Sequence, residues 1–167
     1  GAPVYQLLGG KLRDRIELYT HTLFGNQSPE EFADSAHQAV ELGFRAVKCD
    51  PLGSAQQRMD IAEMRLAAER IAATREAVGE EVEILIEGHG RLNPNTAIRM
   101  ANLLEEYNPF FYEEPVPPEN FDEMAKVAAA INIPVATGER LYTRWSFREL
   151  LEMQAVDYIQ PDLCHCG

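Results

Sequence analysis

The chain alternates between short apolar segments, typical of buried strands, and longer amphipathic segments, typical of helices, over most of its 167 residues. Strands that alternate with helices predict a parallel sheet covered by helices. An open doubly wound sheet and a (β/α)8 barrel both fit this order of elements. The expected strands are residues 15–22, 46–50, 83–89, 110–113, 133–139 and 156–162. The expected helices are residues 29–42, 57–78, 95–107, 121–131 and 145–153.

One helix start is explicit in the sequence. Ser28 is placed to cap a helix, Pro29 occupies its first position and Glu31 its third. Gly43 marks the end of the same helix. The four residues together predict a helix with a reciprocal capping box at its amino end.

Carboxylates at the ends of the last four expected strands decide between the two kinds of sheet. They are Glu87, Glu113 or Glu114, Glu139 and Asp162, at spacings of 26, 26 and 23 residues. In a barrel the carboxyl ends of the strands form one ring around one mouth, where catalytic groups lie, whereas an open sheet spreads them along an edge. We therefore expect a (β/α)8 barrel. A complete barrel has eight strands in about 250 residues, so this chain covers roughly strands one to six.

Several carboxylates that face one mouth repel one another in a partly dry pocket. A hard divalent cation such as Mg²⁺ is the natural compensation, because it takes oxygen ligands from carboxylates, water and substrate. The alternative is that each acid is a solvated strand end. The near-equal spacing, with each acid at the same point of its unit, favours a metal site.

Side-chain alternation along each strand adds further candidates. Glu87 and His89 share a face of their expected strand. A histidine two residues beyond a metal-binding acid is placed for proton transfer to a bound substrate. Of Glu113 and Glu114 only one can point inward, and the other must find a cationic or hydrogen-bonding partner.

Charge and cysteine content argue against several kinds of function. With 15 Lys+Arg against 27 Asp+Glu, the formal net charge of −12 disfavours partners such as nucleic acid or an anionic membrane surface. No stretch approaches the ~20 apolar residues of a membrane-spanning helix. Three cysteines cannot all pair with one another, so a reducing cytoplasm is the expected setting. Cys164-His165-Cys166 suggests zinc, but zinc sites favour four ligands at wider spacing, and Cys49 is the only other cysteine.

Five short motifs stand at or near the ends of the second to sixth expected strands. They are Val47-Lys48-Cys49-Asp50-Pro51, Glu87-Gly88-His89-Gly90-Arg91, Tyr112-Glu113-Glu114-Pro115, Gly138-Glu139-Arg140 and Gln160-Pro161-Asp162. With the acid spacing they resemble the enolase superfamily, and within it the mandelate racemase subgroup, closest to its sugar-acid dehydratases such as galactonate dehydratase. Residues 3–10 also resemble the passage of that family into its barrel, so the resemblance covers essentially the whole chain.

The resemblance implies a metal site and an acid. By position it makes Glu87, Glu113 and Glu139 the Mg²⁺ ligands, and it makes His89 the acid/base on the third strand. The first ligand of the family is usually Asp, so the ligand side chain of Glu87 is one methylene longer.

The resemblance also implies catalytic parts on the second and sixth strands. Lys48 lies in the motif where racemising members carry K-x-K, and Asp50 replaces the second lysine. This replacement argues against racemisation by a lysine base of that strand. Asp162 would orient a catalytic histidine at the end of strand seven, which lies beyond Gly167.

His21 and Arg140 are the candidates for substrate binding. His21 lies at the end of the first expected strand, where a hydrogen-bonded structural histidine is the alternative. Arg140 follows the fifth-strand acid, and there it can grip a substrate carboxylate or pair with a neighbouring acid.

The implied activity is that of an Mg²⁺-dependent carbon–oxygen lyase of sugar acid catabolism. It would remove water from an aldonate or aldarate similar to galactonate and yield a 2-keto-3-deoxy acid through an enediolate. Racemase, epimerase or cycloisomerase chemistry on a related carboxylate is the alternative, as is a non-catalytic homologue that keeps the fold. We expect residues 1–167 to be part of the C-terminal barrel domain of a longer, homo-oligomeric enzyme, without the N-terminal capping domain of the family.

Overall fold

Six strands form one parallel sheet in which each strand lies beside the next along the chain. The computed structural model describes residues 1–164 and 166–167, and the strand order is β1-β2-β3-β4-β5-β6, with every pair parallel. The strands are β1 (Thr20–Phe24), β2 (Ala46–Asp50), β3 (Glu83–Glu87), β4 (Phe111–Glu113), β5 (Val135–Thr137) and β6 (Tyr158–Ile159). The helices are α1 (Val4–Leu7), α2 (Pro29–Glu41), α3 (Ile61–Val78), α4 (Pro94–Leu104), the short 3₁₀ helix η1 (Glu105–Tyr107), α5 (Phe121–Ala128) and α6 (Thr143–Glu152).

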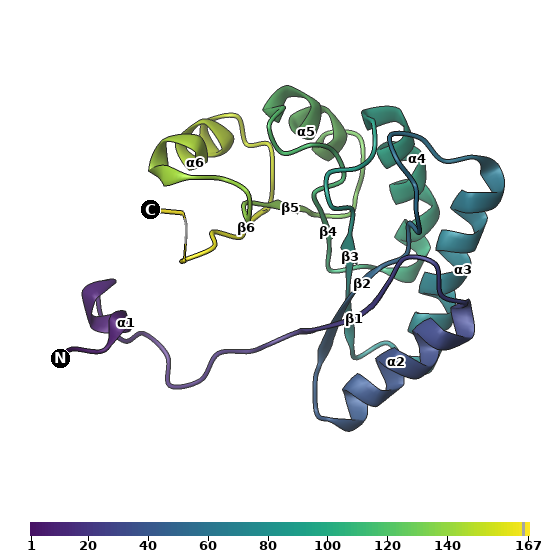
Figure 1. The fold of residues 1–167 in the computed structure, drawn as a ribbon, viewed down its shortest axis with the longest axis horizontal. Helices are drawn as coiled ribbons and strands as arrows, with labels where there is room; N and C mark the ends of the chain where they lie inside the picture. The colour runs from purple at the N-terminus through teal and green to yellow at the C-terminus, as the bar shows by residue number, and fades with distance from the viewer. Residues whose placement is uncertain (165) are drawn as a thin grey trace.

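The position of the helices identifies the sheet as part of a barrel. Helices α2 to α6 lie along the outer side of the curved sheet, and its inner side faces the space that the arc of strands partly encloses (Figure 1). A doubly wound sheet reverses its strand order at a switch point and carries helices on both faces, whereas here the order is sequential. The prediction of six strands of a (β/α)8 barrel is confirmed.

Side-chain caps mark where the helices α2 to α5 begin. Ser28 Oγ accepts the N–H of Glu31 at 3.3 Å, and the Glu31 carboxylate accepts the N–H of Ser28 at 2.8 Å. Both halves of the expected capping box are therefore formed. Asp60 and Glu63 make the same reciprocal pair at the start of α3. These caps determine how much chain remains for each loop over the strand ends.

The main core lies between the helices and the outer face of the sheet. Val47 of β2 and Ile84 of β3 are fully buried there against residues such as Ile71 of α3. A second, smaller cluster lines the inner face and consists of Leu85, Phe111 and Ala136. Alternate positions of one strand thus serve two apolar layers.

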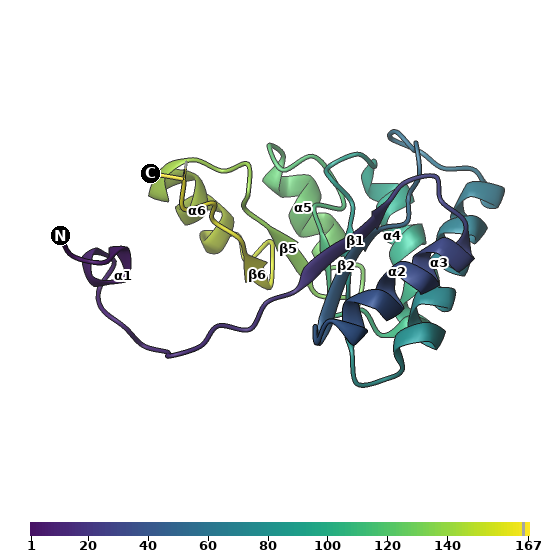
Figure 2. The same cartoon turned by 60° about the horizontal axis from the view of Figure 1, so that its bottom comes forward.

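The amino-terminal segment departs from the expectation. The strand expected over residues 15–22 is observed only as Thr20–Phe24, paired with β2. Ile16 and Leu18 are 77% and 70% exposed, and residues 1–19 extend away from the sheet (Figure 2). Alternating apolar residues form a stable strand only beside a partner strand, and the described residues provide none for positions 15–19.

Other strands end earlier than expected because glycines turn the chain. β3 ends at Glu87 rather than at residue 89, and β5 covers only Val135–Thr137. A Cβ atom at Gly88 would lie 2.6 Å from the Glu114 carbonyl oxygen, and one at Gly138 would lie 2.7 Å from the backbone nitrogen of Gln160, which follows β6. Only glycine allows the backbones to approach this closely.

The helices also begin and end somewhat differently from the expectation. α3 begins at Ile61 rather than near residue 57, because Gln57 takes a φ of 51° and its N–H donates to the Arg91 carbonyl at 2.6 Å. The helix expected over 95–107 is observed as α4 followed by η1, and α5 ends at Ala128. Among the described residues, no helix combines the length and the apolar composition that a membrane crossing requires.

Candidate functional site

Three strands bring a lysine and two glutamates together at the carboxyl edge of the sheet. Glu87 of β3 and Glu113 of β4 are direct partners in the strand register, and Lys48 of β2 is aligned with Leu85, two residues earlier. Alternate positions of a strand share a face, so these side chains lie on the inner side, together with the lining residues Leu85 and Phe111. The parallel register therefore builds the site directly.

The ammonium of Lys48 lies between the two carboxylates. Its Nζ is 2.9 Å from Glu87 Oε2 and 2.7 Å from Glu113 Oε2, and all three side chains are buried. Gln160, which follows β6, donates from Nε2 to Glu113 Oε2 at 3.1 Å. We call Lys48, Glu87, Glu113 and Gln160 the acidic cluster.

The acidic cluster holds two carboxylates for one ammonium. Burial raises the pKa of Glu87 to about 7, the charge of Glu113 acts in the same direction, and Lys48 opposes both. Burial lowers the pKa of Lys48, but the attraction of Glu87 and Glu113 outweighs it and holds that pKa above its usual range. Lys48 is therefore an ammonium, and a further cation would relieve the repulsion that remains.

The donor atoms of the cluster suit a hard divalent cation. Two buried carboxylates and the amide oxygen of Gln160, which is buried and accepts no hydrogen bond from the described residues, are the oxygen ligands that Mg²⁺ takes. Glu139, the third expected ligand, is partly buried after β5. In the described part of the chain, no three His, Cys, Asp or Glu side chains stand close enough together to hold a metal ion. Of the three expected ligands, Glu87 and Glu113 are the two that the strand register brings together, and their role as metal ligands stays a prediction.

The adjacent Glu114 turns away from the acidic cluster. Its φ of 42° is left-handed, and its fully buried carboxylate pairs with Arg140 through Nη2 and, at 3.0 Å, through Nε. The Thr137 hydroxyl donates to it at 3.4 Å. Hydrogen bonding to Glu114 is the main cause that raises the pKa of Arg140. Only Glu113 of the two acids faces inward, as expected of one of them, and Arg140 makes the ion pair that was its alternative role.

His89 reaches the mouth through a turn rather than through strand alternation. β3 ends at Glu87, and His89 takes a left-handed φ of 54° between Gly88 and Gly90. Its N–H donates to Glu87 Oε1 at 2.8 Å, its Nδ1 is 3.8 Å from the same oxygen, and its side chain is 60% exposed. The expectation that both residues share one strand face is wrong because the strand ends first, yet the imidazole does lie beside Glu87.

Two further expected residues lie at the two ends of the sheet, in β1 and after β6. His21 of β1 is aligned with Lys48 in the strand register, and burial, followed by the charge of Lys48, lowers its pKa. Asp162 is partly buried after β6, and its Oδ1 accepts the N–H of Cys164 at 2.7 Å. The roles expected of His21 and Asp162 stay predictions. His165, in the motif considered for zinc, lies outside the described residues.

An arginine for which no role was expected joins the loops after β2 and β3. Arg91 Nη2 donates to both carboxylate oxygens of Asp50 at 2.6 Å, and its Nη1 donates to the Gly53 carbonyl at 2.8 Å. Both charged side chains are largely buried. A sequence signal for this pair exists, because a buried acid at one strand end requires a cationic partner and Arg91 stands at the next strand end.

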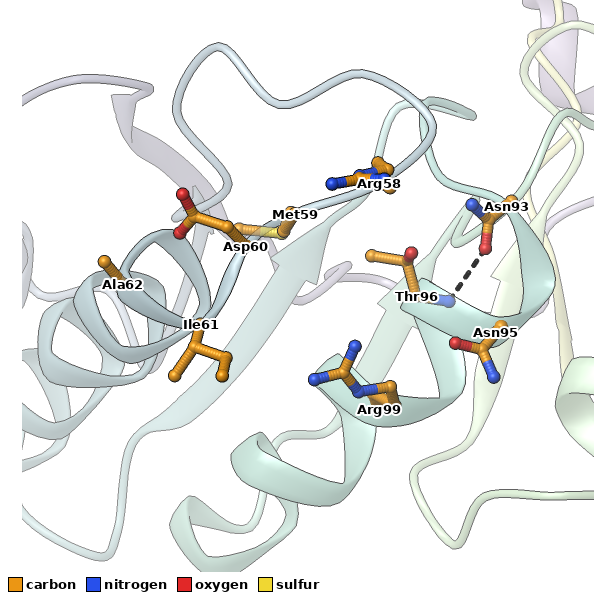
Figure 3. A pocket seen from close by; sticks show the side chains of 9 residues that line it. All are labelled: Arg58, Met59, Asp60, Ile61, Ala62, Asn93, Asn95, Thr96 and Arg99. Atoms are coloured by element: carbon orange, nitrogen blue, oxygen red, sulfur yellow. Dashed lines mark hydrogen bonds between the residues drawn. The ribbon is translucent and has the colours of Figure 1, made fainter.

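A separate groove lies between the first turns of α3 and α4 (Figure 3). It is lined by residues 58–62 and by Asn93, Asn95, Thr96 and Arg99. Asn93 caps α4 by accepting the N–H of Thr96 at 2.9 Å. None of the expected site residues lines this groove, so the acidic cluster remains the candidate site.

Known proteins share both the sequence and the fold of this chain. A family model described as enolase C-terminal domain-like matches residues 31–167. D-gluconate dehydratase of Thermoproteus tenax is 42% identical over 168 residues, a match that covers 100% of this chain and 34% of that protein.

Solved structures agree over the whole length of the chain. A member of the enolase superfamily from Salmonella Typhimurium has a TM-score of 0.93 at 38% identity, over 100% of this chain and 48% of its own. A mandelate racemase/muconate lactonizing enzyme-like protein from Rubrobacter xylanophilus has a TM-score of 0.91 at 39% identity, over 99% and 48%. The chain spans about a third of the length of the curated relative and about half of these solved chains.

Proposed function

The chain belongs to the enolase C-terminal domain-like family, and from this premise we propose that residues 1–167 are part of the barrel domain of a longer, Mg²⁺-dependent dehydratase of sugar acids. The acidic cluster, with His89 beside Glu87, is the observation that carries the proposal. The D-gluconate dehydratase relative makes an aldonate the first substrate to test. The product would be a 2-keto-3-deoxy acid.

Glu87 and Glu113, which the strand register brings together, would hold the metal, and Glu139 would join them as the third ligand when the metal binds. When bound, Mg²⁺ supplies positive charge against the negative charge that develops on the substrate carboxylate as the neighbouring carbon loses its proton. The charge imbalance of the acidic cluster supports a cation at this place, because the buried carboxylates of Glu87 and Glu113 share the single ammonium of Lys48.

His89 is the proposed general acid. Dehydration breaks the C–H bond next to the carboxylate and the C–O bond on the following carbon, and the electron pair from the C–H bond forms the new double bond. The departing hydroxyl needs a proton to leave as water. The imidazole of His89 is exposed to the mouth while its backbone is held by Glu87, so it can deliver this proton. The resulting enol then takes its keto form.

Lys48 contributes a charge to this reaction and does not act as the base. Its ammonium is ion-paired on two sides and its pKa lies above the usual range. This counts against a racemase or epimerase that removes the proton with a lysine of β2. We propose instead that Asp162 orients a histidine base that follows residue 167, and that His21 and the exposed part of Arg140 contact the substrate.

The proposed setting is a reducing cytoplasm, with the full-length protein as a homo-oligomer. Cys49, Cys164 and Cys166 are free thiols, which suits a reducing compartment. Light scattering coupled to size-exclusion chromatography of the full-length protein tests the oligomeric state, and localisation of a tagged protein tests the compartment.

The test is a dehydration assay on the full-length protein after chelation. D-gluconate, D-galactonate and other aldonates and aldarates are incubated with and without added Mg²⁺, and the 2-keto-3-deoxy acid is detected through its keto group. We expect turnover only with Mg²⁺, and a loss of at least ~10³-fold in Glu113→Gln. The control Glu152→Gln, in an exposed pair with Arg148, should keep full activity. Undiminished turnover in metal-free buffer would rule out the mechanism, and racemisation without water loss would favour the alternative.

A further inference from the structure

We propose that Arg91, held in place by Asp50, is a positioning residue that fixes the turn carrying His89. The proposal rests on the proposed function, in which His89 is the acid. The turn at residues 88–90 is anchored on both sides of β3, by the end of β4 and by the end of β2.

On one side, oxygen atoms at the ends of β3 and β4 accept hydrogen bonds from the backbone N–H groups of the turn. The N–H of Gly88 donates to the Glu113 carbonyl at 2.7 Å, and the N–H of Gly90 donates to the Glu114 carbonyl at 2.8 Å. The N–H of His89 donates to the Glu87 carboxylate at 2.8 Å. These bonds satisfy the three amide groups but place no restraint on the carbonyl of Gly88.

On the other side, Arg91 donates hydrogen bonds to the carbonyl of Gly88. Its Nε donates to the oxygen of Gly88 at 3.2 Å, and its backbone N–H donates to the same oxygen at 3.3 Å. Its Nη1 and Nη2 are held by the Gly53 carbonyl and the Asp50 carboxylate. A planar guanidinium presents these donors in a rigid geometry that a lysine lacks, so one side chain joins the turn to the carboxyl end of β2.

The conformation of His89 needs such a restraint. A φ of 54° is costly for a residue with a side chain and persists only where the surroundings over-determine it. The imidazole is 60% exposed, so packing against neighbouring side chains restrains its position only in part. A shift of about 1 Å in a catalytic group can cost about 100-fold in rate.

Asp50 keeps Arg91 in its place. The two side chains are 9% and 15% exposed, so loss of either one leaves a poorly hydrated charge. Asp50 Oδ1 also accepts the N–H of Leu52 at 3.0 Å, which ties the carboxylate to its own loop. The acid two residues after Lys48 is therefore the counterpart of the arginine two residues after His89.

The test compares Arg91→Lys, Arg91→Met and Asp50→Asn in the full-length protein with a matched control. Arg75 is also buried and donates to carbonyls, those of Gly79, Val82, Tyr107 and Asn108, but it lies outside the site. The measurements are kcat and KM of dehydration, exchange of the substrate hydrogen next to the carboxylate with deuterium, and backbone amide exchange at residues 88–90.

We expect Arg91→Lys to lower kcat by about 10- to 100-fold with KM within about twofold. Hydrogen exchange on the substrate, which needs a base but not the acid, should persist. In a His89→Asn background, Arg91→Lys should cause no further loss of kcat. Amide exchange at residues 88–90 should accelerate in Arg91→Lys and stay unchanged in Arg75→Lys.

Equal losses of dehydration and of substrate hydrogen exchange would overturn the proposal, as would unchanged amide protection at residues 88–90. If Arg91→Met does not fold, Arg91→Lys and Asp50→Asn decide the question. If the wild-type protein dehydrates no sugar acid, the proposed function fails, while the amide exchange data still decide whether Arg91 holds the turn.

Discussion

Buried charges of two kinds stand side by side at the carboxyl edge of this sheet. In the acidic cluster the single ammonium of Lys48 serves two carboxylates, whereas Glu114 and Asp50 each have their own guanidinium, from Arg140 and Arg91. All of these carboxylates are buried, so the two regions differ in charge balance and not in exposure to water. We call the acidic cluster the unbalanced region, and the pairs Glu114–Arg140 and Asp50–Arg91 the balanced region. A balanced pair holds backbone in place, while an unbalanced cluster has room for another cation.

The titration behaviour reflects the same contrast. In the unbalanced region burial and Glu113 raise the pKa of Glu87 to about 7. In the balanced region hydrogen bonding to Glu114 is the main cause that raises the pKa of Arg140. Perturbed carboxylates in a cleft mark functional sites more often than balanced pairs do.

The largest effect is expected from a substitution in the unbalanced region. Glu87→Gln should lower turnover of the full-length protein by at least ~10³-fold and weaken Mg²⁺ binding strongly, because it removes one buried carboxylate from the proposed ligands. Calorimetric Mg²⁺ titration beside the dehydration assay measures both. Unaltered Mg²⁺ affinity would show that the charge imbalance does not serve a metal.

His89→Asn should separate the acid from the metal. We expect a loss of dehydration of about 10²- to 10⁴-fold. Mg²⁺ affinity should stay within about threefold of the wild type, because His89 lies 3.8 Å from Glu87 but is not one of the proposed ligands. The same pair of measurements applies. A large loss of Mg²⁺ binding would show that His89 is itself a metal ligand. Near-normal turnover would show that His89 is not the acid.

In the balanced region the effect should fall on stability. Arg140→Met leaves the fully buried carboxylate of Glu114 without its cation and should lower the free energy of unfolding by about 3 kcal/mol. The double variant Glu114→Met/Arg140→Met should recover most of this loss. Urea denaturation followed by circular dichroism checks both, and a single variant as stable as the wild type would mean that the pair is not structurally needed.

In the unbalanced region, neutralising one carboxylate should not lower the free energy of unfolding. In metal-free buffer, Glu87→Gln should leave the free energy of unfolding within about 1 kcal/mol of the wild type or raise it, because it removes one of two repelling carboxylates while Lys48 keeps Glu113. A loss as large as that of Arg140→Met would erase the distinction between the two regions.

The smallest effect is expected for chemical labelling of Cys49, a neutral thiol next to Asp50 of the balanced region. Burial raises the pKa of the Cys49 thiol to about 12, and the charge of Asp50 adds to it. Because the thiolate is the reactive form, Cys49 should resist maleimide labelling in the native protein at pH 8 and react in urea. Mass spectrometry of the labelled peptides measures this, and rapid native labelling would show that water reaches this strand.

Much of the fold could be predicted because its signals are local. β2 is observed at Ala46–Asp50 as expected, and the capping box of Ser28 and Glu31 forms at the expected helix start. Such signals act over a few residues and need no knowledge of the partner elements. Residues 15–19 show the limit, since their alternation predicts a strand that forms only beside another strand.

The candidate site could be predicted in its ingredients and only partly in its geometry. Glu87 and Glu113 meet as direct register partners, because acids at equivalent points of successive βα units must converge at one edge of a parallel sheet. The prediction that His89 lies in the strand is wrong. Gly88 and the left-handed turn at His89 replace the last two expected strand positions.

The sequence by itself determined the family, the order of elements and the edge of the sheet where the acids gather, since periodicity, caps and motif spacing are written along the chain. Only the tertiary structure decided which charges meet. Lys48 and Glu113 are 65 residues apart, Asp50 and Arg91 are 41 apart, and Glu114 and Arg140 are 26 apart. The choice of partner depends on strand register and on the direction in which each turn leaves its strand, and these are properties of neighbouring elements in contact that no local pattern specifies.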